Sequence, residues 1–325
     1  MLTGVDAEPV ASRTLPTRNH LYLFCVVILV EGLARLGSPR LIDRVARTLA
    51  SLAYRVSRTK RARTEQNVTR VFGPSLAPAE RARIVRGAFH TFWDETMSFV
   101  PWRAAHEPRP EVSGLEHLEA ALAAGTGAIL WESGFFGRRH IAKQALREHG
   151  FRIHQVHDER HRGGFERDDD ESWLRDRVVF PYFARREREF TEEIITLPVS
   201  EPSLAFTRRF LAILQRNGIL CITADVPQGR RLVSLHVLGE PNRFATGMVT
   251  LSKSCGAPLL PLFCVQDHDG RIQVIIEPPI PIPNEGGRDA ILERPLRQYA
   301  LRLESYIRRY PEQYRSWHYP WWLPT

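Results

Sequence analysis

The sequence is poor in cysteine and in lysine. Its 325 residues include only four cysteines, and these lie in apolar stretches without a Cys-x-x-Cys spacing. This argues against a disulfide framework and against a zinc site, and predicts small buried side chains in a reducing compartment. The cysteines are Cys25, Cys221, Cys255 and Cys264. Three of the 45 basic residues are lysines, so the other 42 are arginines. We give this bias no functional weight because base composition of the genome contributes to it.

Long hydrophobic runs are also missing. The most apolar stretch, Leu21–Val30, has ten residues and is followed by Glu31 and Arg35. It is well short of the roughly 20 residues that span a bilayer. The sequence contains no Walker loop, no Gly-x-Gly-x-x-Gly fingerprint and no Gly-x-Ser-x-Gly elbow. These absences argue against nucleotide-binding enzymes of the common types and against α/β-hydrolases.

The charge balance is strongly basic. The formal net charge is +8, and the isoelectric point is about 9.7. A content of 43% hydrophobic and 25% charged residues is ordinary for a globular protein and excludes a disordered chain. The surplus of positive charge implies an anionic partner, either a membrane surface or a nucleic acid. Because the sequence contains no nucleic-acid-binding motif, we predict an anionic membrane surface and no nucleic acid.

A segment after the apolar run has the pattern of a helix that lies on a membrane. Apolar residues recur there at helical spacing, arginines fall elsewhere on the wheel, and a basic stretch follows at 58–63. This pattern is typical of a helix in an anionic bilayer surface, and the alternative is a core-packing helix with a solvated arginine face. We predict a leader at 1–19 and a membrane-associating helical region at 20–105. The apolar stripe consists of Leu41, Ile42, Val45, Leu49, Leu52 and Val56.

The remainder of the chain, 106–325, has the pattern of an α/β domain. A Pro-rich joint at 106–112 precedes it, and strands then alternate with helices. This order predicts a mostly parallel sheet flanked by helices. An amphipathic helix with a stripe from Ile291 to Tyr310 is expected near the end, and the aromatic segment 317–322 is expected to close the core. Strands are predicted at 128–131, 152–156, 194–197, 219–223, 257–265 and 271–277, and a further helix at 203–216.

Several segments resemble the late acyltransferases of lipid A biosynthesis, the lauroyl and myristoyl transferases. They occur in the order of that family and cover about 20–322, so the sequence is identified as a member of it. The segments are RTEQNVTRVFGP (63–74), ILCITADVPQG (219–229), a short loop with a Thr-Gly helix start and a Gly-Ala-Pro strand (238–263), and ESYIRRYPEQYRSWHYPWW (304–322).

The resemblance implies a glycerolipid acyltransferase-like fold and a defined reaction. A fatty acyl chain passes from acyl carrier protein or coenzyme A to a hydroxyl of a glycolipid at the inner membrane. The thioester is a co-substrate, and no metal or organic cofactor is implied. In the family a His-x4-Asp/Glu motif after the first strand supplies a base and its orienting carboxylate. An ungapped placement on 127–140 puts Gly134 at the histidine and Arg139 at the acid, so this sequence lacks the motif.

Other acid–base residues lie near the missing motif. Glu132 and His140 flank it, and His157 stands at the end of the second strand, where sites of α/β proteins form. We take these three as candidate catalytic residues. The alternative for each histidine is a solvated position, and the alternative for Glu132 is a strand-end salt bridge to Arg138 or Arg139. His157 also has acidic neighbours in sequence, Asp158 and Glu159.

Four further residues are candidates for substrate binding: Arg139, Asp225, Arg230 and Arg231. The last two follow a strand end and suit bidentate binding of a phosphate or phosphopantetheine group, with a solvated turn as the alternative. Asp225 matches the acidic strand-end residue of the family and is expected to position loops or arginines. The segment 161–171 contains another His-x4-Glu spacing and an acidic run, and we expect a solvated loop without a metal there.

The first hypothesis is a membrane-surface acyltransferase with rearranged catalytic groups, on the cytoplasmic side of the bacterial inner membrane. Its oxyanion would be held by backbone N–H groups of the turn 133–137. The alternative is an inactive lipid- or carrier-binding pseudoenzyme of the same fold.

Overall fold

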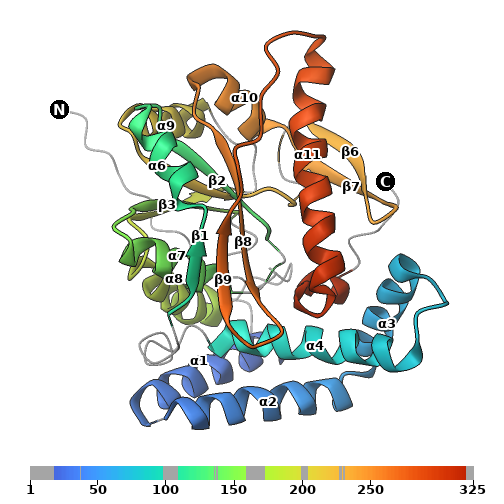
Figure 1. The fold of residues 1–325 in the computed structure, drawn as a ribbon. Helices are drawn as coiled ribbons and strands as arrows, with labels where there is room; N and C mark the ends of the chain where they lie inside the picture. Colours follow the sequence, from blue (N-terminus) through green and yellow to red (C-terminus); the bar gives the residue numbers. More distant parts are fainter. Residues whose placement is uncertain are drawn as a thin grey trace.

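A seven-stranded sheet forms the centre of the protein in this computed structural model (Figure 1). The strand order is β1-β9-β8-β2-β5-β3-β4. From β8 to β4 all neighbours are parallel, whereas β9 is antiparallel to β8 and β1 is parallel to β9. The prediction of a mostly parallel sheet is confirmed. The strands are β1 (Glu111–Ser113), β2 (Ala128–Glu132), β3 (Ile153–Asp158), β4 (Glu193–Leu197), β5 (Ile219–Thr223), β8 (Leu259–Gln266) and β9 (Ile272–Ile276).

The structure describes residues 18–36, 38–97, 109–134, 136, 138–158, 173–198, 204–226, 229 and 231–319. Helices cover both faces of the sheet, because each parallel strand must return to its starting edge through a crossover. The crossover and C-terminal helices are α6 (Leu115–Ala123), α7 (Arg139–Glu148), the π-helical turn η2 (Arg175–Val179), α8 (Phe180–Arg188), α9 (Leu204–Gln215), α10 (Gly247–Cys255), α11 (Arg288–Arg309), η3 (Pro311–Gln313) and η4 (Arg315–His318).

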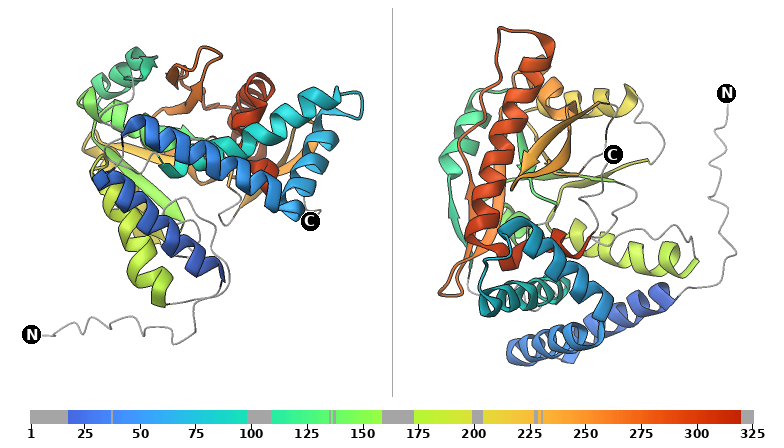
Figure 2. Two further views of the ribbon diagram at one scale, coloured as in Figure 1. Left: turned by 90° about the horizontal axis from the view of Figure 1, so that it is seen from below. Right: turned by 90° about the vertical axis from the view of Figure 1, so that its right-hand side faces the viewer.

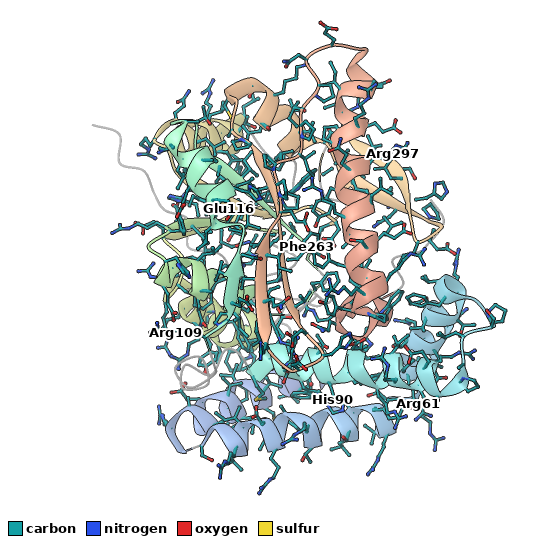
Figure 3. The ribbon with its side chains drawn as sticks, in the orientation of Figure 1. Arg61, His90, Arg109, Glu116, Phe263 and Arg297 are labelled. Carbon is teal, nitrogen blue, oxygen red and sulfur yellow. The ribbon has the colours of Figure 1, made fainter. Side chains whose placement is uncertain are left out.

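Two apolar layers result from the alternation of side chains along the strands. Leu130 of β2 packs with α6 and α7, whereas the next residue, Trp131, packs on the face that α9, α10 and α11 cover. Phe263 of β8 lies between the sheet and α11 (Figure 3), where its ring stacks on Tyr306 at 4.0 Å between centroids. Trp317 is fully buried in the same layer, as expected of the aromatic segment, whereas its residues 320–322 lie outside the described residues.

A β-hairpin replaces the short loop expected before the Thr-Gly helix start. It consists of β6 (Leu232–Val237) and β7 (Glu240–Ala245), which pair antiparallel. The two residues between them, Leu238 and Gly239, have φ of +56° and +82°. Positive φ at both positions is the requirement of the tight turn that matches strand twist. The expected loop was therefore wrong, because Leu-Gly is an unusual sequence for this turn.

Four helices form a layer at one end of the sheet, at the bottom of Figure 1. They confirm the helical pattern predicted for 20–105 as far as Met97. Within the described residues, none of the helices combines the length and the apolar character needed to cross a membrane. Residues 1–17 of the predicted leader, 98–105 of the predicted helical region and 106–108 of the joint lie outside the described residues. The helices are α1 (Arg18–Leu36), α2 (Pro39–Val56), α3 (Arg58–Phe72) and α4 (Pro78–Met97).

The cysteines are not all buried, in contrast to the prediction. Cys221 and Cys264 are buried in the sheet, but Cys255 is half-buried and Cys25 is exposed. Cys25 is exposed because the apolar run of α1 has an outward face as well as the face that packs on its neighbours. That outward face also carries Leu21 and Ile28.

Candidate active site

The carboxyl ends of the parallel strands bring the three predicted catalytic residues close together. Glu132 is the last residue of β2, His157 lies near the end of β3, and His140 stands in the first turn of α7. All three side chains are buried. They are not solvated loop or helix-surface residues, which was the alternative for the two histidines.

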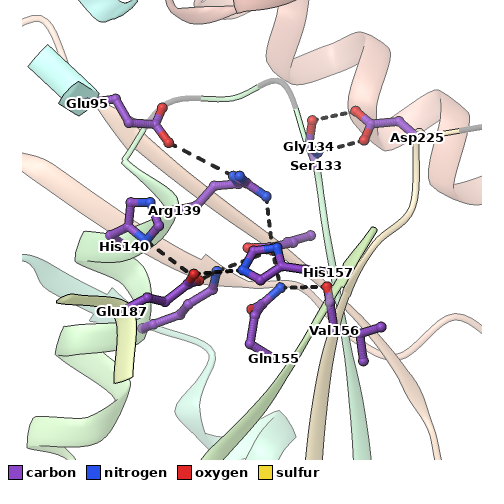
Figure 4. A network of polar contacts seen from close by, with 12 residues as sticks. Glu95, Ser133, Gly134, Arg139, His140, Gln155, Val156, His157, Glu187 and Asp225 are labelled. Carbon is purple, nitrogen blue, oxygen red and sulfur yellow. Dashed lines mark hydrogen bonds and ion pairs between the residues drawn. The ribbon is translucent and has the colours of Figure 1, made fainter. Parts of the chain in front are cut away.

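His157 forms a histidine–carboxylate pair with Glu187 of α8 (Figure 4). Its Nε2 lies 2.7 Å from Oε2 of Glu187, and both side chains are buried. Burial alone would raise the pKa of Glu187, but the interactions with His157 and Lys143 outweigh it and hold this pKa well below its ordinary value. An ionised carboxylate only accepts hydrogen bonds, so Nε2 is the donor. Among the described residues none forms a hydrogen bond with Nδ1, and the carboxylate therefore selects the tautomer in which Nδ1 is the basic atom.

The sequence did not predict Glu187 as the carboxylate partner of His157, because Asp158 and Glu159 are its acidic neighbours in sequence. The surrounding run of arginines suggests a solvated helix. A signal was nevertheless present, because Glu187 follows Phe180 and Phe183 at helical spacing and so lies on the apolar face of α8. Glu159 lies outside the described residues.

A buried lysine connects this pair to the end of β2. Nζ of Lys143 lies 3.5 Å from Oε1 of Glu187 and 3.4 Å from Oε1 of Glu132. The Glu132 oxygen also accepts from Gln155 at 3.2 Å and from Arg139 at 3.4 Å. Burial disfavours the charged forms, but the attraction between the opposite charges outweighs it. The pKa of Lys143 is therefore raised and that of Glu132 is lowered. The cluster is therefore a set of mutually compensating buried ions.

Arg139 is held inside this cluster. Its guanidinium lies 3.4 Å from Glu132 on one side and 3.9 Å from Glu95 of α4 on the other. Glu95 is in turn 3.4 Å from Arg315. The strand-end salt bridge considered as the alternative for Glu132 is thus present. Arg138, the other possible partner, instead donates to Asp94 at 2.7 Å.

His140 lies behind the pair. Its Nδ1 is 3.8 Å from Oε1 of Glu187, and its ring is 5.6 Å from that of Phe190. Burial lowers the pKa of His140 well below its ordinary value, and the nearby positive charges lower it further. The charge of Glu187 acts in the opposite direction but is outweighed. His140 is therefore a neutral side chain. It does not line the cavity described below.

Asp225 occupies the end of β5 beside the turn after β2 (Figure 4). Its carboxylate accepts from Oγ of Ser133 at 2.5 Å and from the N–H of Gly134 at 2.6 Å. Burial raises the pKa of Asp225 to about 6, although these hydrogen bonds oppose the shift. A Cβ atom at Gly134 would lie 3.3 Å from Oδ1 of Asp225. Asp225 thus binds the turn after β2, and it accepts a hydrogen bond from an N–H group that was a candidate oxyanion donor.

A mostly apolar cavity of about 440 Å³ opens beside His157. Arg231 lines its rim and forms an ion pair with Asp289, with a half-exposed side chain. Arg230 and the segment 161–171 lie outside the described residues. A volume of this size is typical of small-ligand sites. Besides His157 and Arg231, the lining includes Trp131, Val156, Leu197, Phe206, Phe210, Ile222, Val226, Met248 and Leu251.

Comparison with known proteins identifies the family of this chain. The model of the family described as bacterial lipid A biosynthesis acyltransferase matches residues 11–150 and 182–323. The chain is also similar to phosphatidylinositol mannoside acyltransferase of Mycobacterium tuberculosis, from the strains CDC 1551 / Oshkosh and ATCC 25618 / H37Rv, with 26% identity over 215 residues in each case. These matches cover 61% of this chain and 59% of the relative. The family match spans most of the sequence, and the chain belongs to the bacterial lipid A biosynthesis acyltransferase family.

Proposed function

We propose that this protein transfers an acyl chain from a thioester to a hydroxyl of a membrane glycolipid, with His157 as the general base. The observation that carries the proposal is the buried hydrogen bond between His157 and Glu187, at the edge of an apolar cavity that His157 itself lines. A histidine oriented by a carboxylate is the usual means of deprotonating a hydroxyl near neutral pH.

The reaction follows from this arrangement. Nδ1 of His157 takes the proton of the acceptor hydroxyl while its oxygen forms a bond to the thioester carbonyl carbon. Glu187 stabilises the resulting imidazolium through Nε2. When the tetrahedral intermediate collapses, the carbon–sulfur bond breaks, and the imidazolium returns its proton to the departing thiolate. The products are an ester and a free thiol, and His157 is regenerated.

The oxyanion of the intermediate needs donors near the cavity. Gly247 and Met248, in the first turn of α10, line the cavity. The N–H groups of a first helical turn have no acceptor within the helix. We assign them to the oxyanion in place of the turn 133–137, where Asp225 already binds the Gly134 N–H.

The substrates are proposed from the cavity and from the relatives. The apolar lining suits a fatty acyl chain, delivered as a thioester of acyl carrier protein or coenzyme A. The relatives are named for acylation of a phosphatidylinositol mannoside, and this supports a glycolipid acceptor here. Arg231 and Arg230 are the residues we propose for the phosphate of the donor.

We also propose that the protein lies on the cytoplasmic face of the bacterial inner membrane. The support is an apolar ridge of exposed side chains on α2. The other members of the predicted stripe, Ile42, Val45 and Leu49, pack in an apolar cluster with α1 and α4. Leu52 and Val56 are 53% and 65% exposed, and Leu41 continues the ridge. Arg44 and Arg55 lie beside it on the helix, so the face combines apolar contact with attraction to anionic lipid.

The activity is tested with purified protein, a panel of acyl carrier protein and coenzyme A thioesters, and total membrane lipid, with mass spectrometry of the lipids as the readout. We expect a new acylated lipid that is lost in His157→Ala and Glu187→Gln. His154→Ala is the matched control. His154 lies on the same strand as His157 and pairs with Glu193 of β4 at 3.3 Å, but it does not line the cavity. If the wild-type protein forms no product but still binds lipid, the pseudoenzyme replaces this proposal.

The membrane site is tested separately by co-sedimentation with anionic vesicles. Leu52→Glu combined with Val56→Glu is expected to reduce the bound fraction at least tenfold, whereas Leu301→Glu should not, although Leu301 on α11 is also 63% exposed. Equal loss in both variants would refute a specific role for α2.

A further inference from the structure

The helix that carries Glu187 is held by the first helix of the chain. Figure 2 shows α1 and α8 side by side in two views, and both contribute to one apolar cluster. Val27 and Val30 of α1 are buried there, together with Phe180 and Phe183 of α8. The position of Glu187 is therefore coupled to a helix that is more than 150 residues away in sequence.

One carboxylate joins the polar sides of these two helices. Oε2 of Glu31 on α1 accepts from the Tyr182 hydroxyl at 3.1 Å and from Nη2 of Arg186 at 3.0 Å. Its other oxygen accepts from Arg35 of the same helix at 3.1 Å. Partial burial opposes ionisation, but the hydrogen bonds from Tyr182, Arg35 and Arg186 outweigh it and lower the pKa of Glu31.

Arg186 immediately precedes Glu187 on α8. Successive side chains of a helix point about 100° apart, so one turn of α8 presents Arg186 to α1 and Glu187 to His157. Glu189 also contacts Arg186, at 3.1 Å, but it caps the end of α8 and holds no second helix. A small rotation or shift of α8 would lengthen the 2.7 Å hydrogen bond to His157.

We propose that Glu31 is a positioning residue for the histidine–carboxylate pair. It fixes the rotation of α8 through Tyr182 and Arg186, and thereby the place of Glu187 against His157. This inference rests on the proposed function. The position of α1, whose outward face is apolar, would thereby affect the hydrogen bond between Glu187 and His157.

The test compares Glu31→Gln with the wild-type protein in the acyl-transfer assay, with anionic vesicles that carry the acceptor. We expect kcat to fall by roughly tenfold to a hundredfold, because misplacement of a catalytic group by about 1 Å has effects of this size. KM for the thioester should not change, since Glu31 is remote from the cavity. Glu189→Gln, which removes the contact within α8 alone, is expected to keep the wild-type kcat.

A charge swap separates positioning from general destabilisation. Glu31→Arg with Arg186→Glu restores an ion pair between the helices and is expected to recover most of the lost kcat, whereas Glu31→Arg alone should not. The inference is overturned if Glu31→Gln keeps the wild-type kcat, or if the swap recovers nothing while thermal unfolding is unchanged. If Glu31→Gln does not fold, Tyr182→Phe is used instead. It removes one of the two hydrogen bonds between Glu31 and α8, and the same measurement of kcat then tests the inference. An inactive wild-type protein would instead refute the proposed function, so the two failures are distinct.

Discussion

Replacement of Lys143 by methionine is the perturbation with the largest expected effect on stability. The ammonium group is fully buried and lies 3.4 Å from Glu132 and 3.5 Å from Glu187. Methionine retains nearly all the apolar length of the side chain, so the main change is the loss of one positive charge. Two buried carboxylates then remain with fewer compensating cations.

The size of the effect follows from these distances. At an effective dielectric constant of about 20, each of the two attractions is worth roughly 5 kcal/mol. Removal of the ammonium from water costs several kcal/mol and offsets a large part of that gain. Measured losses on breaking a buried ion pair by removal of one partner are about 3–5 kcal/mol. We expect Lys143→Met to reduce the free energy of unfolding by this amount.

The assay is urea unfolding followed by far-UV circular dichroism, with the slope of the transition as a check that the unfolded state is unchanged. The matched variant is Lys143→Met with Glu132→Gln, which removes one negative charge together with the positive one. It should recover at least about 2 kcal/mol of the loss, because the buried charges again balance. A loss below about 1 kcal/mol for the single variant, or no recovery in the double variant, would refute the electrostatic reasoning.

Three further outcomes are expected. The pKa of Asp225 is raised from 3.8 to about 6, so its stabilising contribution is complete below pH ~4 and is lost as the pH rises through 6. Relative to Asp225→Asn, the wild-type protein should lose about 3 kcal/mol of unfolding free energy over that window, measured by unfolding at a series of pH values. Gly87→Ala should destabilise the protein by about 1–3 kcal/mol despite the helix propensity of alanine, because the new Cβ would overlap that of Glu312. Urea unfolding measures this loss. Cys25 should react with a maleimide in the native protein, as peptide mapping would show, whereas Cys221, whose thiol pKa is raised by burial, should react only after unfolding.

The sequence was sufficient for six of the seven strands of the sheet, because they are short apolar runs bounded by turn residues. The edge strand β1 was not predicted, since it has three residues and overlaps the expected Pro-rich joint. β5, for example, occupies the predicted residues 219–223. The hairpin of β6 and β7 was not predicted, since its strands alternate weakly and its turn sequence, Leu238-Gly239, is uncommon. Part of the site was also accessible: the end of a parallel strand marked Glu132 and His157, since side chains at these ends converge on one edge of a sheet.

The sequence by itself determined the family, the alternation of strands and helices, and the departure of Gly134 and Arg139 from the family motif. Only the tertiary structure decided which carboxylate pairs with His157. Glu187 lies 30 residues after His157 and reaches it because α8 packs back over the end of β3. Lys143 looks like a surface lysine in sequence, yet it is fully buried between two carboxylates. Such pairings depend on the packing of separate elements, and no local pattern of residues encodes them.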